Sequence, residues 1–180
     1  MFLTITKAPM TRYKWSILLL LGVLIMGGCG VRYSFSGGSI PTGMNTVTVH
    51  LIENRAPIVN PNLTETITEG LKTRIRTQSR LSQVSADGDG IFEGFITEYT
   101  IGPAAVEAGT DRAALNRLSI TVSITYTNDI VPEDNFEQRF TRYKDFSSAT
   151  VPIQVQEEEI VRDIVNMLTE DIYNRAFANW

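Results

Sequence analysis

The chain has 180 residues, of which 43% are hydrophobic and 20% are charged, and its net charge is −4. These proportions are those of a globular protein and exclude a long disordered tail. The acidic balance gives no general attraction to nucleic acid or to an anionic membrane surface. The sequence holds one cysteine, so it forms no internal disulfide, and an exported domain must be stabilised by packing, by a partner or by both.

The first 28 residues predict a cleaved export signal. Lys7, Arg12 and Lys14 precede an apolar run at 15–26, and small residues follow it. This order of basic, apolar and small residues is typical of a secretory signal. The run is about a dozen residues long, whereas a membrane-spanning helix needs about 20. Removing residues 1–28 lowers the net charge from −4 to −7, because all three lost charges are basic.

Cys29 predicts a lipid anchor. Residues 26–29, Met-Gly-Gly-Cys, resemble the bacterial lipobox, with Met26 where Leu is usual. The alternative is an ordinary signal peptide followed by an unpaired thiol. Stable anchoring needs at least two membrane-binding signals, and the three acyl chains of a bacterial lipoprotein, palmitate among them, meet that need without a transmembrane helix. We expect residues 29–44 to be a lipidated flexible tether and residues 45–180 to be a single domain.

The domain begins with a strand and a helix. Residues 46–52 alternate between polar and apolar side chains, which predicts a half-buried strand with Val47, Val49 and Leu51 facing inward. A helix is predicted over residues 62–78, because apolar side chains recur there at every fourth position and form a stripe that can be buried. The stripe consists of Leu63, Ile67, Leu71 and Ile75.

The start of this helix carries two possible capping signals. Asn62 with Glu65 resembles a capping box, with Asn in place of Ser or Thr. Asn60 can equally be the N-cap residue with Pro61 in the first helical position. Both predict a helix that begins within two residues of position 61.

Glycines predict one close contact and one turn. Gly70 lies inside the helix, where glycine costs about 1 kcal/mol relative to alanine, so it marks a close approach of the helix to the sheet. Residues 87–90, Asp-Gly-Asp-Gly, predict a turn. They resemble part of a calcium-binding loop, but Ile91 occupies the third ligand position and the required Glu is missing, so the turn is favoured.

Three further strands are predicted over 92–101, 118–127 and 136–146, with a loop at 102–113. The first alternates imperfectly, which is consistent with a β-bulge. Its two faces carry Phe92, Gly94 and Ile96 on one side, and Phe95, Tyr99 and Ile101 on the other. The second alternates strictly between apolar and Ser or Thr residues. Its polar, uncharged face suits water, or a partner that must be neither repelled nor matched in charge.

A second helix over residues 156–177 completes the domain. Glu157, Glu158 and Glu159 lie in its first turns, where the helix dipole favours negative charge. Its apolar stripe consists of Ile160, Ile164, Leu168 and Ile172. The element order is therefore β-α-β-β-β-α. We predict an α+β two-layer sandwich in which two helices pack on one face of a four-stranded, mostly antiparallel sheet.

The inventory of reactive side chains argues against an enzyme. His50 is the only histidine and lies in an alternating strand, where it is most simply a residue of the polar face. The chain has no second His or Cys for a zinc site, and acyl transfer lacks its usual base. We therefore expect no catalytic residues, no metal and no cofactor.

Two basic clusters contrast with the acidic background. They consist of Lys72, Arg76 and Arg80 on the first helix, and Arg139, Arg142 and Lys144 on the last strand. The helical set lines one face if the helix extends to Arg80, and Arg142 and Lys144 share a face that Arg139 does not. One interpretation is complementation of the helix dipole or a solvated surface. The other is contact with phosphate groups, which Arg binds with two parallel hydrogen bonds.

Five segments in this order and spacing resemble the LPS-assembly lipoprotein LptE family, in particular its Bacteroidota-type branch. They are residues 60–65 (NPNLTE), 92–99 (FEGFITEY), 116–122 (NRLSITV), 136–146 (FEQRFTRYKDF) and 171–180 (DIYNRAFANW). The resemblance extends over nearly the whole mature chain. No single segment is specific by itself.

The resemblance implies a non-catalytic outer-membrane lipoprotein, anchored through acyl chains on Cys29 and facing the periplasm and a barrel lumen. Such proteins plug the LptD-type β-barrel of the LPS transport translocon, assist its assembly and contact lipopolysaccharide. The resemblance does not by itself assign either basic cluster a role, but the phosphate interpretation would have one of them meet lipopolysaccharide phosphates; nucleic acid is no partner. The alternative is a free-standing lipoprotein adaptor for another envelope complex, such as a peptidoglycan synthase or a secretion channel.

Overall fold

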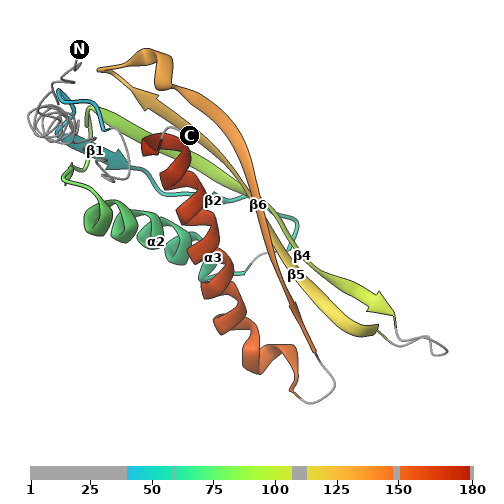
Figure 1. Ribbon diagram of the computed structural model, residues 1–180. Coiled ribbons are helices and arrows are strands. Elements are labelled where there is room, and N and C mark those ends of the chain that lie inside the picture. Colours follow the sequence, from blue (N-terminus) through green and yellow to red (C-terminus); the bar gives the residue numbers. More distant parts are fainter. Residues whose placement is uncertain (1–39, 59, 107–112, 148–150, 179–180) are drawn as a thin grey trace, which may run out of the picture. The chain divides into compact units, whose positions relative to one another are not determined.

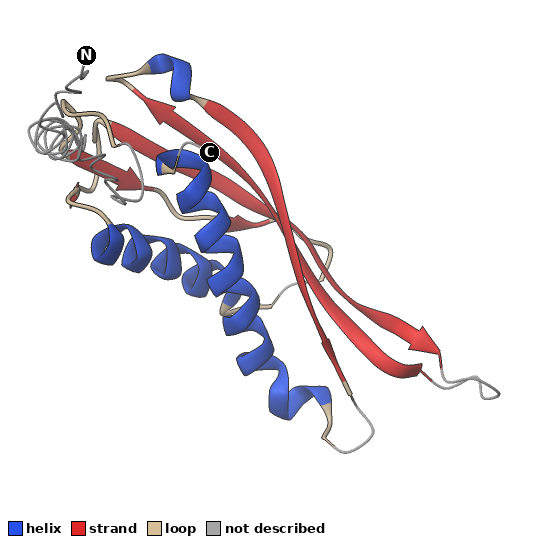
Figure 2. Ribbon diagram, in the orientation of Figure 1, coloured by secondary structure: helices blue, strands red, loops and turns tan. Residues whose placement is uncertain are grey.

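The computed structural model describes residues 40–58, 60–106, 113–147 and 151–178, so the predicted signal, Cys29 and most of the predicted tether lie outside the described residues. Two helices lie on one face of a mixed sheet (Figures 1 and 2). The elements are β1 (Thr46–Val49), β2 (Glu53–Asn54), α2 (Leu63–Gln78), β3 (Ser82–Gln83), β4 (Gly90–Val106), β5 (Ala113–Asn128), the 3-10 helix η1 (Pro132–Asp134), β6 (Phe136–Phe146) and α3 (Ile153–Phe177).

The sheet order is β3-β1-β4-β5-β6, and β2 also pairs with β4. The long strands β4, β5 and β6 pair antiparallel, whereas the short strands β1, β2 and β3 pair in parallel. The predicted α+β class, with both helices on one face of a mostly antiparallel sheet, is confirmed. The strand count differs, because β2 and β3 are two residues each and too short to show an alternation.

Both predicted helical stripes lie in the core, where they meet the apolar face of β5. The buried residues of the three elements are Leu63, Ile67, Leu71 and Ile75 of α2, Ile160, Ile164, Leu168 and Ile172 of α3, and Leu118, Ile120, Val122, Ile124 and Tyr126 of β5. Full burial of one such aliphatic side chain contributes about 1.5–3 kcal/mol, so this layer interface is the main source of stability.

The first strand is shorter than predicted. Val47 is buried and Val49 packs against the core, but Leu51 is 62% exposed. The strand ends at Val49, which breaks the alternation, and Ile52 takes the buried position instead. The backbone N–H of Ile52 donates to the Thr68 hydroxyl of α2 at 3.1 Å. The inward assignment of Leu51 was therefore wrong.

The predicted bulge in β4 is confirmed, and it changes which residues face the helices. Ile96 pairs with Val122, and after the irregularity Tyr99 pairs with Ile120. Because one extra residue reverses all later side chains, Tyr99 and Ile101 lie on the helix face together with Ile96, contrary to the sequence-based assignment. The predicted loop at 102–113 was also too long, since β4 continues to Val106 and β5 begins at Ala113.

Neither predicted cap describes the N-terminus of α2, because Asn62 is the N-cap residue and the helix begins at Leu63 rather than at Pro61. The side chain of Asn62 makes no capping hydrogen bond, so the capping box with Glu65 is wrong. Instead, Oδ1 of Asn60 accepts the N–H of Asn62 at 3.1 Å, and its carbonyl accepts the N–H of Leu63 at 3.2 Å. Helix α3 begins at Ile153, three residues earlier than predicted, which places Glu157 beyond the first turn.

Gly70 marks a close contact between the helices. A Cβ atom at this position would lie 3.1 Å from Cγ1 of Val165 in α3. The predicted close approach therefore exists, but its partner is α3 rather than the sheet. Arg74, one turn further along α2, connects the same two helices through hydrogen bonds to the Thr169 hydroxyl at 3.1 Å and the Asn166 carbonyl at 2.9 Å.

The turn at 87–90 fastens the start of β1 to the sheet. Asp87 has a φ of 53°, as in tight turns, and Oδ2 of Asp89 accepts the N–H groups of Asn45 and Thr46 at 2.8 Å each. These two backbone hydrogen bonds hold the pKa of Asp89 below its ordinary value. The carboxylate thus has a structural role, as the turn interpretation predicts.

We expect the Asp89→Asn variant to melt at a lower temperature than the wild type at pH 7, because it removes the charge that the two N–H groups stabilise. A depressed folded-state pKa gives stability that is present above the unfolded pKa and lost as pH falls through the folded pKa. The difference should therefore begin to narrow as pH falls below about 3.8 and vanish once pH has passed below the lower folded-state pKa. Thermal melts at pH 7 and in acid test this, with exposed Asp87→Asn as control. A pH-independent difference would contradict it.

Candidate functional site

The predicted basic row on α2 is not continuous. The helix ends at Gln78, and Ser79 is its C-cap residue in an extended conformation. Arg80 therefore lies outside the helix and donates to the Pro41 carbonyl at 2.9 Å, close to where the described chain begins. The predicted row of three cations required a helix that extends to Arg80, and α2 ends before that residue.

The other two cations of this cluster have partners on their own helix. Nζ of Lys72 lies 2.8 Å from Oε1 of Glu69, and the guanidinium of Arg76 donates to the Thr73 hydroxyl at 3.3 Å. Arg76 also lies in the last turn, where a cation complements the helix dipole by about 0.3–1 kcal/mol. Complementation of the helix dipole and a solvated surface therefore account for the placement of these two cations.

On β6, Arg142 and Lys144 share a face, as predicted, and the structure shows that this face is turned toward the helices. The Arg142 guanidinium binds both carboxylate oxygens of Asp171 at 2.6 and 2.7 Å, and Lys144 donates to Asp163. The hydrogen bond to Asp171 raises the pKa of Arg142 above its ordinary value. Both cations therefore fasten the sheet edge to α3. Arg139 points to the opposite, open face and is exposed, and within the described residues no carboxylate pairs with it.

The open face of β5 carries the predicted Ser and Thr residues, on the side of the sheet that neither helix covers (Figure 2). Most of these side chains are partly or fully exposed, but Thr121 is buried and bonds to Glu98 and to the Thr141 hydroxyl at 3.0 Å each. The row therefore forms a polar surface fixed at its centre by cross-strand hydrogen bonds.

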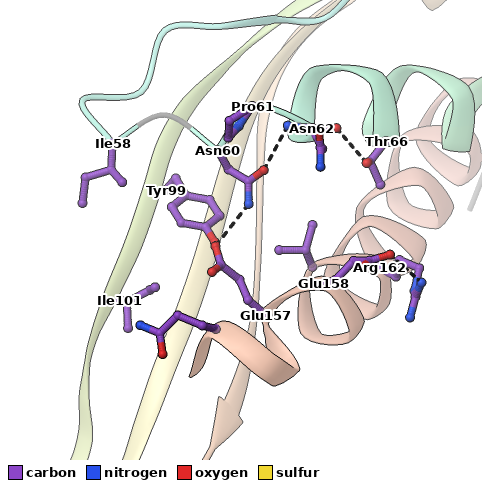
Figure 3. Close-up of a pocket in the computed structure, with 12 residues that line it drawn as sticks. Ile58, Asn60, Pro61, Asn62, Thr66, Tyr99, Ile101, Glu157, Glu158 and Arg162 are labelled. Atoms are coloured by element: carbon purple, nitrogen blue, oxygen red, sulfur yellow. Dashed lines mark hydrogen bonds and ion pairs between the residues drawn. The ribbon is translucent and has the colours of Figure 1, made fainter. Parts of the chain in front are cut away.

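A cleft of about 540 Å³ lies where both helices begin and β4 passes beneath them (Figure 3). Its lining mixes apolar and polar side chains from the entry to α2, from β4 and from α3. The residues that line it include Ile58, Pro61, Ile101 and Val161, with Asn62, Gln154, Glu158 and Arg162.

Three polar side chains connect the walls of this cleft. The Tyr99 hydroxyl donates to Oε1 of Glu157, which also accepts the side-chain N–H of Asn60 at 3.2 Å (Figure 3). Burial raises the pKa of Tyr99, and the hydrogen bond to Glu157 raises it further. The phenol is therefore neutral and serves as a donor. The network joins β4, α3 and the entry to α2, so the cleft is a preformed feature of the fold.

Sequence reasoning missed this cleft. Tyr99 was assigned to the wrong face because the bulge position was unknown, and Glu157 was explained by the helix dipole alone. The start of α2 was predicted to within two residues, but the contact of Asn60 with Glu157 joins residues 97 positions apart and leaves no local signal in the sequence.

The described part of the chain shows no cluster of metal-ligating side chains and no apolar spanning helix. Among the residues that the structure describes, no three His, Cys, Asp or Glu side chains gather where they could hold a metal ion. His50 is exposed, and its Nε2 lies 3.8 Å from Oε1 of Glu93, on the polar surface as predicted. No helix formed by the described residues is long and apolar enough to cross a bilayer.

Solved structures share the arrangement. A hypothetical protein from Chlamydia trachomatis is 9% identical, with a TM-score of 0.55, over 73% of this chain and 95% of that chain. Rare lipoprotein B from Shewanella oneidensis is 11% identical, with a TM-score of 0.49, over 71% and 89%. A minor lipoprotein from Acinetobacter baumannii is 12% identical, with a TM-score of 0.49, over 73% and 91%. The first likeness supports a common fold. No curated protein matches the sequence.

Two helices on one face of a mixed sheet define a small α+β domain of two layers (Figure 2). A family model described as LptE, lipopolysaccharide-assembly, matches residues 44–176. The match covers most of the chain, and the chain belongs to the LptE family. Membership indicates a lipoprotein of lipopolysaccharide assembly at the outer membrane, in a family that is non-catalytic.

Proposed function

We propose that this protein is the non-catalytic lipoprotein subunit of the LPS transport translocon, seated in the lumen of an LptD-type β-barrel and contacting lipopolysaccharide during outer-membrane assembly. The observation that carries the proposal is the family match over residues 44–176. Its mechanism is occupancy: a rigid domain fills part of the lumen and presents polar contacts, with no bond made or broken.

The described residues are consistent with this mechanism. Ion pairs and hydrogen bonds from Arg142, Lys144 and Arg74 hold α3 to the sheet edge and to α2, which gives a domain that keeps its shape inside a partner. The Ser and Thr face of β5 can form hydrogen bonds to a polar barrel wall without requiring opposite charge. Acyl chains on Cys29 would hold the domain at the periplasmic leaflet of the outer membrane.

Purification from detergent-solubilised outer membranes tests the proposal. A tagged copy of the protein should retain a large β-barrel in stoichiometric amount. Depletion of the protein in its own cells should leave lipopolysaccharide at the inner membrane. Normal delivery of lipopolysaccharide, with a partner from peptidoglycan synthesis or a secretion channel, would instead support the adaptor function.

Of the six predicted cations, Arg139 is the best candidate for a lipopolysaccharide phosphate, because it is exposed on the open face and no described carboxylate neutralises it. A hydrogen bond to a charged group contributes about 1.5–3 kcal/mol, so Arg139→Ala should weaken binding of purified lipopolysaccharide about tenfold with no change in melting temperature. Arg142→Ala is the matched control. It should lose at most about 1 kcal/mol of stability and bind normally. Equal binding by both variants would refute the assignment.

A further inference from the structure

Exposed aliphatic side chains gather at the end of the domain where the helices begin. Ile58 is 56% exposed and Ile101 is 44% exposed, and both line the cleft (Figure 3). Val155, in the first turn of α3, is 74% exposed, and Val151 lies just before that helix. Large aliphatic side chains left in water beside a cleft are typical of a surface that a partner covers.

The cleft has the size and construction of a binding site. Its volume of about 540 Å³ lies within the usual range for ligand pockets, and its lining offers both apolar side chains and polar groups, as such pockets do. The hydrogen bonds among Tyr99, Glu157 and Asn60 fix the walls relative to one another. An occupant therefore need not order the cleft before it binds, which lowers the free-energy cost of association.

The charges around the cleft select the occupant. Glu157 and Glu158 line it, and Glu159 follows on the exposed surface of α3. The one cation in the lining, Arg162, is paired with Glu158 at 2.9 Å. The net charge at this end is therefore negative. A lipid phosphate would be repelled, whereas a basic side chain next to an apolar anchor would be attracted.

We propose that this cleft binds a segment of the barrel partner that carries an aliphatic or aromatic side chain next to a lysine or arginine. This inference rests on the proposed function and adds which end of the domain contacts the barrel. The apolar side chain enters between Ile58, Ile101 and Val161, and the basic one meets the excess negative charge of the row Glu157, Glu158 and Glu159. Arg139, on the open face of the sheet, then remains free for lipopolysaccharide.

Crosslinking in cells tests the contact directly. A photoreactive phenylalanine replaces Ile101 in the full chain, and in a matched chain it replaces Val84, which is 37% exposed but lies outside the cleft lining. We expect the barrel to be crosslinked from position 101 and not from position 84. Crosslinks from position 101 that lead to lipopolysaccharide, or to this chain's own residues, would overturn the proposal.

Substitution separates this inference from the proposed function. Ile101→Lys and Ile58→Asp should each reduce the barrel recovered with the tagged protein about tenfold, as loss of an interface anchor does, whereas Val84→Lys should not. Glu158→Lys should also reduce recovery, and Glu133→Lys in η1 should not. Both cleft positions are exposed, and unchanged melting temperatures confirm folding. If the wild-type protein retains no barrel, the proposed function is refuted. If all variants retain the barrel equally, only the assignment of the cleft as the contact site is refuted.

Discussion

A chain in which residues 1–28 are replaced by an ordinary secretory leader and Cys29 by Ser is expected to be a soluble periplasmic protein, whereas the wild type is expected in the membrane fraction. Each buried CH₂ of an acyl chain contributes about 0.8 kcal/mol, so three long chains together supply on the order of tens of kcal/mol of anchoring.

The measurement needs a Gram-negative host that lacks the partner barrel, because a barrel would retain even the unanchored domain in the membrane fraction. Mass spectrometry of the wild-type protein should show a mature chain that begins at Cys29 and carries three acyl groups. The Cys29→Ser chain should show the unmodified mass and fractionate with periplasmic proteins. A wild-type protein of unmodified mass would refute the lipid anchor.

Elements in which a hydrophobic pattern extends over many residues could be predicted from the sequence, whereas the shortest strands could not. The strict alternation of 118–127 predicted β5 except for its first residues, and the boundaries of β6 were predicted to the residue. The helical stripes also predicted the buried layer correctly. In contrast, β2 and β3 are two residues each, and their parallel pairing with β4 and β1 depends on tertiary contacts that leave no local pattern.

The candidate site was less accessible to sequence reasoning because its contacts are distant in the chain. Tyr99 and Glu157 are 58 residues apart, and the bulge near residue 97 reverses the face on which Tyr99 lies. The two basic clusters were visible in the sequence, but the acids that pair with Arg142 and Lys144 lie on α3, 29 and 19 residues away. Composition could therefore identify the charges but could not show which of them were already paired.

Gly70→Leu is expected to destabilise the domain by about 1–3 kcal/mol, the usual cost of inserting side-chain volume into a packed interface. A Cβ atom at position 70 already lies 3.1 Å from Cγ1 of Val165 and 3.5 Å from Cγ2 of Thr169. A leucine must push α2 and α3 apart, which stretches the hydrogen bonds of Arg74 to α3. The gain in helix propensity over glycine, about 1 kcal/mol at most, does not offset this.

Urea unfolding of the unanchored chain measures the effect, with Thr73→Leu as control at an exposed position of the same helix. The control should be as stable as the wild type or nearly so.

Gly70→Leu should also change the shape of the cleft, because Thr66 and Val161 line it one helical turn before Gly70 and Val165. Helices separated at Gly70 widen the cleft between its walls, so we expect Gly70→Leu to retain less barrel even at temperatures where it remains folded. A stable variant with normal barrel recovery would show that the close helix contact is not what shapes the cleft.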